Sequence, residues 1–190
     1  KLDQAIEKFD ELARRQPKPV AAHTMIGMIL QMQGKNADAQ KRYERALEID
    51  PRAAVAANNL AWLYAEGAGN LDVALQLAQA AKASLPDAAE VNDTLGWVYY
   101  KKDLAGLAVA LLVQAAEKEP ANATYHYHLG LAYAKSGEKA KAKASLEAAL
   151  KANPSFDGAA DEKKTLAGLQ KAAWGSTRHP HCACCPYACR

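Results

Sequence analysis

The sequence has little cysteine, no long apolar run and almost no excess of charge. No hydrophobic stretch approaches the roughly 18 residues that suggest a membrane-spanning helix, which argues against direct membrane insertion. Outside the last 16 residues, residues 1–174 carry 22 basic against 21 acidic side chains. Such a balance lacks the basic footprint of a nucleic-acid-binding protein. The four cysteines all lie between Cys182 and Cys189, so residues 1–174 give no information about the redox compartment of the protein.

Motifs for chemistry are also missing from residues 1–174. This part of the sequence contains no nucleophile motif, no phosphate-binding glycine loop and no zinc-protease signature. We therefore expect a binding protein without a cofactor in this region, and not an enzyme. The sequence begins at Lys1 directly on an amphipathic pattern, from which we expect a fragment of a longer chain.

Prolines recur along the chain at a nearly constant spacing. The separations are 34, 35, 34 and 34 residues between Pro17, Pro51, Pro86, Pro120 and Pro154. A fixed period of this length indicates an array of helix pairs. In such an array each unit packs on its neighbours and one long curved face stays free for a partner.

Small residues recur at equivalent places between the prolines. Each full unit has a Leu or Ile beside a Gly or Ala in its first helical stretch, at Ile26-Gly27, Leu60-Ala61, Leu95-Gly96 and Leu129-Gly130. A small residue here lets two helices approach closely. We expect Gly34, Gly137 and Asp103 to end the first helix of their units in a left-handed conformation.

This pattern resembles the tetratricopeptide repeat of bacterial proteins over residues 1 to about 156. The resemblance implies an all-α, right-handed superhelical solenoid of antiparallel helix pairs. Its units are the second helix of a truncated repeat at 1–19, repeats at 20–53, 54–88 (with one inserted residue), 89–122 and 123–156, a capping helix at 157–174 and a Cys/His-rich tail at 175–190. The compartment is not indicated, and both the bacterial cytoplasm and the periplasm are compatible with it.

The resemblance also implies where a partner binds. In this family the first helix of each unit lines a concave groove, which predicts a partner-binding site at Met28, Asn58, Trp62, Asp93, Trp97, Tyr100, Tyr127 and Leu131. The implied function is a scaffold that binds a peptide or helix of a partner protein. Alternatively, the aromatic residues wedge between successive helices. The three methionines, Met25, Met28 and Met32, suit an adaptable apolar surface, or else they fill gaps against the preceding helix.

Two other hypotheses remain open. A homo-oligomeric scaffold would use apolar side chains that the half repeat exposes, at Ile6, Phe9 and Leu12. A metal-binding protein would hold zinc or copper in the tail, through His179, His181, Cys182, Cys184, Cys185 and Cys189. The abrupt change of composition at residue 175 also resembles a cloning junction, and the paired CxxC spacing of standard zinc sites is missing.

Overall fold

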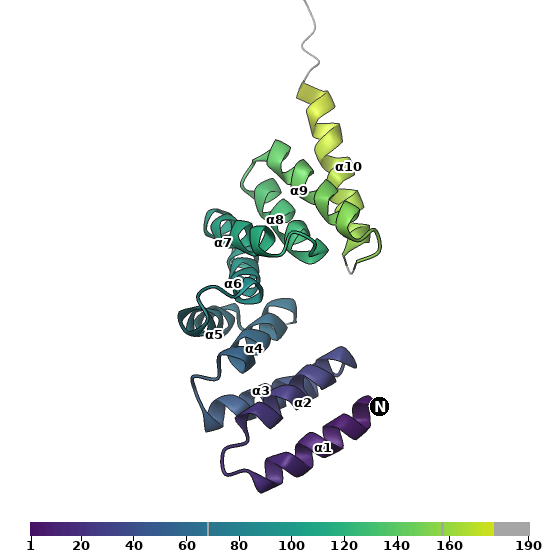
Figure 1. The fold of residues 1–190 in the computed structure, drawn as a ribbon. Helices are drawn as coiled ribbons and strands as arrows, with labels where there is room; N and C mark the ends of the chain where they lie inside the picture. The colour runs from purple at the N-terminus through teal and green to yellow at the C-terminus, as the bar shows by residue number, and fades with distance from the viewer. Residues whose placement is uncertain (68, 157, 177–190) are drawn as a thin grey trace, which may run out of the picture.

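The computed structural model describes residues 1–67, 69–156 and 158–176, with side chains up to 168 except that of residue 162. This part of the chain forms ten helices that stack one after another from the N-terminus (Figure 1). They are α1 (Leu2–Arg15), α2 (Val20–Met32), α3 (Asn36–Ile49), α4 (Ala54–Glu66), α5 (Leu71–Ser84), α6 (Ala89–Lys101), α7 (Ala105–Lys118), α8 (Ala123–Lys135), α9 (Lys139–Ala152) and α10 (Ala159–Ser176). The prediction of an all-helical array of antiparallel pairs is confirmed.

Glycine sets the distance between the two helices of a pair. A Cβ atom added at Gly27 would lie 2.5 Å from the ring of Tyr43, and one at Gly96 would lie 2.7 Å from Leu112 Cγ. Real Cβ atoms essentially never approach other atoms so closely, so any larger residue at Gly27 or Gly96 would force the partner side chain to shift. The expected role of the small residues in close helix packing is thus confirmed.

The turns inside three units use a left-handed residue, as predicted. The backbone φ is +73° at Gly34, +86° at Gly137 and +63° at Asp103. After Gly34, the N–H of Lys35 donates to the carbonyl of Leu30 at 2.9 Å, a bond that closes the end of the helix. In these three units the first helix therefore stops where the second helix must turn back.

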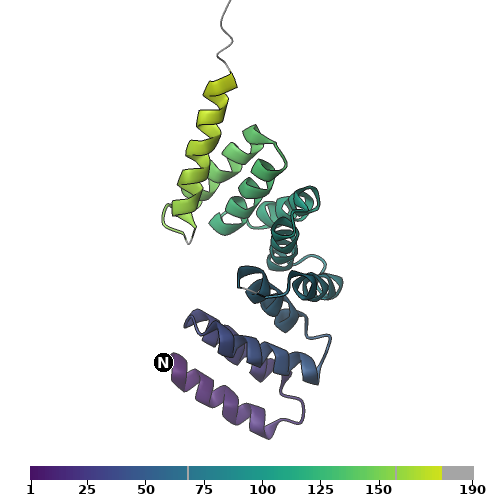
Figure 2. The ribbon, with the colours of Figure 1, turned by 180° about the vertical axis from the view of Figure 1, so that it is seen from behind.

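The array curves because the first helices of consecutive units contact one another. Helix α4 contacts α2 and α6, and α6 contacts α8, whereas the second helices α3, α5, α7 and α9 make no comparable contact with each other in the described part of the chain. The first helices therefore line the inner, concave side of the superhelix, which both ribbon views show (Figures 1 and 2). None of the described helices is long and apolar enough to cross a membrane.

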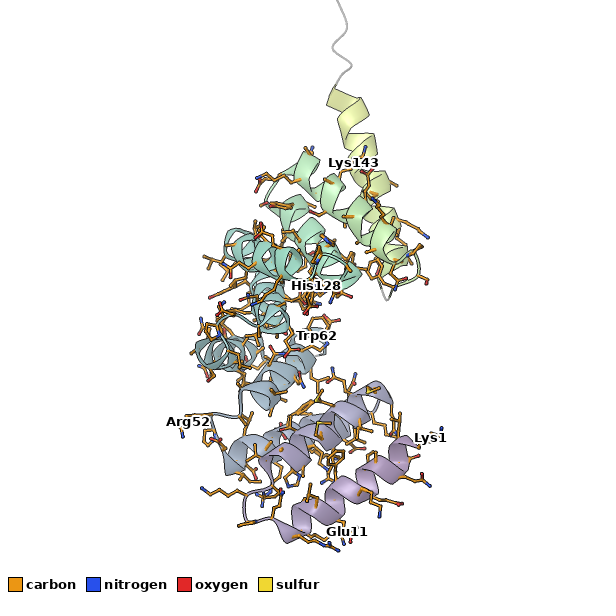
Figure 3. All side chains as sticks on the ribbon, in the orientation of Figure 1. Lys1, Glu11, Arg52, Trp62, His128 and Lys143 are labelled. Atoms are coloured by element: carbon orange, nitrogen blue, oxygen red, sulfur yellow. The ribbon has the colours of Figure 1, made fainter. Side chains whose placement is uncertain are left out.

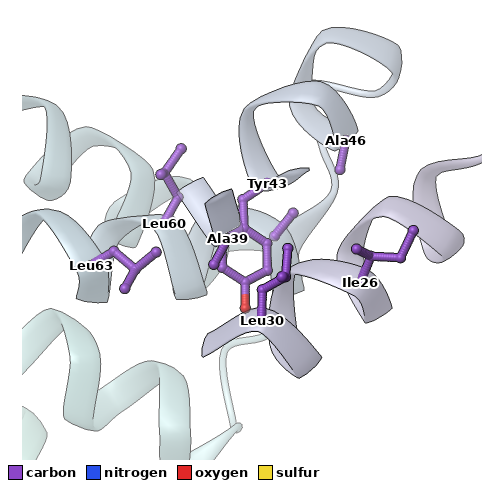
Figure 4. Close-up of a cluster of buried hydrophobic side chains, with 8 residues drawn as sticks. Ile26, Leu30, Ala39, Tyr43, Ala46, Leu60 and Leu63 are labelled. Atoms are coloured by element: carbon purple, nitrogen blue, oxygen red, sulfur yellow. The ribbon is translucent and has the colours of Figure 1, made fainter. Parts of the chain in front are cut away.

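Helix α1 belongs to the first hydrophobic core. Ile6 and Phe9 are half-buried and pack against the cluster around Ile26 and Tyr43 (Figure 4), so the expectation that this helix exposes them is wrong. Only Leu12 of that set is exposed, at 40 %. The physical reason is that α2 and α3 provide the apolar surface that a lone second helix needs. At the other end, α10 packs on α9.

Candidate partner-binding groove

All eight residues predicted for the groove lie on the first helices α2, α4, α6 and α8, but they differ in exposure. Met28 is 38 % exposed. Partly exposed side chains are Trp62, Tyr100, Tyr127 and Leu131. The remaining three are buried, with exposures of 5 % at Asn58, 4 % at Asp93 and 6 % at Trp97. The predicted set therefore divides into side chains that a partner can reach and side chains that support them.

Trp97 lies at the centre of a stack of rings. Its indole is 4.1 Å from the imidazole of His128, 4.8 Å from Tyr100 and 6.4 Å from Trp62, measured between ring centroids. The planes differ by 28° or less in all three pairs. Figure 3 shows Trp62 and His128 near the middle of the array, where α4, α6 and α8 meet. The stack thus joins three successive units on their inner side.

Polar contacts fix Trp97 further. Its Nε1–H donates to Glu66 Oε1 at 2.6 Å, across the interface between α6 and α4. The ammonium of Lys101 lies 3.2 Å from the same carboxylate and 4.9 Å from the indole ring. The ring is therefore held on its edge by a hydrogen bond and on its face by neighbouring rings.

A buried hydrogen bond between a histidine and an aspartate completes the stack. His128 Nδ1 lies 2.8 Å and 3.0 Å from the two carboxylate oxygens of Asp93, and both side chains are almost fully buried. Because a carboxylate only accepts hydrogen bonds, Nδ1 carries a proton. His128 was not among the residues predicted for the groove. The available signal was its place on α8, one residue more than a full repeat beyond Asp93 and next to Tyr127.

The N-terminal end of the concave side contains an apolar cavity. It has a volume of about 370 Å³ and lies between α2 and α4. Met25, Met28 and Val55 border it with exposures of 39 %, 38 % and 40 %. Met32 is 75 % exposed, and none of the three methionines is a buried core residue. Sequence reasoning found the methionines of this cavity but missed Val55.

The proposed metal site of the tail cannot be placed, because His179, His181, Cys182, Cys184, Cys185 and Cys189 lie outside the described residues. Among the residues that are described, no group of three or more His, Cys, Asp or Glu side chains has the arrangement of a metal site. The hypothesis of a zinc or copper tail therefore stays a prediction.

Comparison with protein families identifies the repeats. Two family models, both described as tetratricopeptide repeat, match residues 24–89 and residues 123–156, which together make up more than half of the chain. The chain belongs to the tetratricopeptide repeat family. Repeats of this family imply a scaffold for protein–protein interaction. No curated protein matches the sequence.

Solved structures of bacterial repeat proteins share the fold. YrrB, described as a TPR protein with an unusual peptide-binding site, superimposes with a TM-score of 0.70 at 20 % identity, covering 92 % of this chain and 87 % of YrrB. PilW, a type IV pilus biogenesis factor, superimposes with a TM-score of 0.70 at 18 % identity, covering 95 % of this chain and 88 % of PilW. A thermophilic TPR protein of Thermus thermophilus gives 0.66 at 21 % identity, with 90 % and 91 % covered. At these identities the similarity concerns the fold.

Proposed function

We propose that the protein is a scaffold that binds an apolar segment of a partner protein, a peptide or a helix, along its concave groove. The observation that carries the proposal is the exposed apolar cavity between α2 and α4. Membership of the family supports a protein partner, and the cavity supports the groove as the place where that partner binds.

The chemistry of the cavity favours an apolar occupant. Its lining comes from Val20, Ala21, Thr24, Met25, Met28 and Ala53–Ala56, and none of these side chains is charged. Burial of apolar surface contributes about 25 cal/mol per Å². Flexible methionine side chains adapt to the shape of such a ligand. An apolar segment therefore gains affinity here that a charged one does not.

The aromatic residues extend this surface toward the C-terminal repeats. Trp62, Tyr100 and Tyr127 are partly exposed, and their positions are fixed by the buried Trp97 and His128 between them. Rigid aromatic side chains lose little entropy on binding and dominate many interfaces. We propose that they contact the continuation of the same segment.

A selection of displayed random peptides against the full chain tests the proposal. The informative variant is Met28→Lys, and the matched control is Leu107→Lys on α7, where Leu107 is 55 % exposed. Both replace an exposed apolar side chain by a cation, so both variants are expected to fold. The proposal predicts that Met28→Lys weakens binding of the selected peptides at least about tenfold, because truncation of a hot-spot residue costs about 2 kcal/mol or more. Full binding by Met28→Lys, or equal loss in the control, contradicts it.

A further inference from the structure

A second pocket lies on the concave side, between the middle units. It has a volume of about 270 Å³ and is lined by residues of α4, α6 and α8 and by Asn122, which precedes α8. This volume is below the range of about 300–1,000 Å³ typical of pockets for drug-sized molecules. The pocket therefore suits a single side chain of a partner more than a separate small molecule.

The charge of this pocket is negative. Glu90 and Asp93 line it from α6, and neither Lys nor Arg is among its lining residues. Tyr125, also in the lining, has a pKa raised above its ordinary value, first by burial and then by the carboxylates of Asp93, Glu119 and Glu90. Three carboxylates thus act on one point of the pocket, and a cationic group would be attracted to it.

Among the described residues in the wall of the pocket, one buried hydrogen-bond acceptor has no donor and another is only partly used. Asn58 is 95 % buried, and its Oδ1 has no hydrogen-bond partner within the described part of the chain. Asp93 accepts from His128 Nδ1, which uses only part of the capacity of a carboxylate. A buried acceptor without a donor destabilises the folded state, so a ligand that brings a donor to Asn58 Oδ1 removes that cost.

We propose that this pocket binds the guanidinium group of an arginine side chain in the partner segment. A guanidinium is planar, stays charged and has five N–H donors, which fits the acceptors of Asn58 and Asp93 together with the carboxylate of Glu90. The indole of Trp62 forms part of the same wall, and arginine binds well against aromatic rings. The inference rests on the proposed function, because it names a residue that the segment in the groove carries.

A small-molecule titration tests the pocket without any knowledge of the partner. The probes are N-acetyl-arginine amide and its neutral isostere N-acetyl-citrulline amide, added to the isotope-labelled full chain. We expect the arginine probe to shift the NMR signals of the Trp62 indole N–H and the Asn58 side-chain amide. Citrulline should bind at least about tenfold more weakly, because it lacks the charge that strengthens hydrogen bonds to the carboxylates. Equal shifts with both probes, or no shift at Trp62 and Asn58, overturn the inference.

A pair of charge-neutral variants provides the control. Glu90→Gln removes a carboxylate from the wall of the pocket, and Glu7→Gln removes an exposed one from α1. Because Glu90 is exposed, we expect about a two- to fivefold loss of affinity for the arginine probe in Glu90→Gln and none in Glu7→Gln. Unchanged affinity in Glu90→Gln contradicts the inference, and so does an equal loss in both variants.

The peptide selection separates this inference from the proposed function. Enrichment of arginine in the selected peptides supports the proposed arginine pocket. Replacement of that arginine by citrulline should then lower the affinity of the peptides about tenfold. Peptides that depend on Met28 but show no preference for arginine overturn the inference and leave the proposed function standing. If the arginine probe binds at Trp62 but no peptide binds the groove, the pocket exists and the proposed function fails.

Discussion

The buried position of Trp97 makes Trp97→Ala the most informative single substitution in the array. The side chain is 6 % exposed, stacks on three neighbouring rings and donates to Glu66. Truncation of a buried Trp to Ala costs about 3–5 kcal/mol. The exposed carboxylate of Glu66 is rehydrated after the loss of its donor, so this hydrogen bond adds little to that cost. We therefore expect the free energy of unfolding to fall by about 4 kcal/mol.

The effect should be local as well as large. Stability of a repeat array is approximately a sum over units and their interfaces, and Trp97 joins the units of α4, α6 and α8. Urea unfolding followed by circular dichroism measures the total loss, and hydrogen exchange measures which helices open. We expect faster exchange in α6 and α8, and the urea curve of the variant should separate into two transitions.

A matched substitution at the surface serves as control for this prediction. Leu107→Ala on α7 truncates an exposed side chain and should change stability by about 0.5 kcal/mol or less. If Trp97→Ala costs less than about 1 kcal/mol, the buried stack does not hold the middle units together. Loss of peptide binding in Trp97→Ala would then require a direct contact, because no loss of structure could account for it.

Three further predictions concern the helix packing, the turns and a buried tyrosine. Gly96→Ala should destabilise the protein by about 1–3 kcal/mol, measured by urea unfolding, because the new Cβ lies 2.7 Å from Leu112 Cγ; no change would mean that α6 and α7 separate freely. Gly34→Ala should lower the free energy of unfolding by about 1–2 kcal/mol because φ is +73°, although no atom lies within 4 Å of the added Cβ. Gly106→Ala, where the added Cβ also meets no atom within 4 Å, should not destabilise the protein. Equal effects of the two substitutions contradict this reasoning. Burial raises the pKa of Tyr43 from 10.0 to about 12, so between these pH values the folded state keeps a proton that the unfolded state releases. The free energy of unfolding should therefore fall as the pH rises from 10 to about 12. In Tyr43→Phe, measured by unfolding at a series of alkaline pH values, this part of the pH dependence should be missing.

The repeat architecture could be predicted because its signals are local. The proline period, the small residues and the left-handed turn residues each act within one unit, and the structure has Gly34, Asp103 and Gly137 in the expected conformation. The division of the groove could not be predicted in this way. Trp97 is buried in part by His128, which belongs to the following unit. A sequence pattern within one unit gives no information about that contact.

The contacts of the half repeat, helix α1, could not be predicted from its sequence pattern either. Its apolar residues were expected at a free surface, yet Ile6 and Phe9 pack on the core of the first full unit. An amphipathic pattern indicates that a face is buried, but it does not indicate which neighbour covers it. The neighbour here is the pair α2 and α3 of the same chain, so these two side chains do not form the surface that self-assembly would need.

Hydrogen exchange with a selected peptide bound tests the central claim most directly. The account predicts slower exchange at the inner helices α2, α4, α6 and α8, strongest around Met28 and Trp62. It also predicts no change on the outer helices α3, α5, α7 and α9. Protection confined to the outer helices, with the inner ones unchanged, would contradict a scaffold that binds its partner in the concave groove.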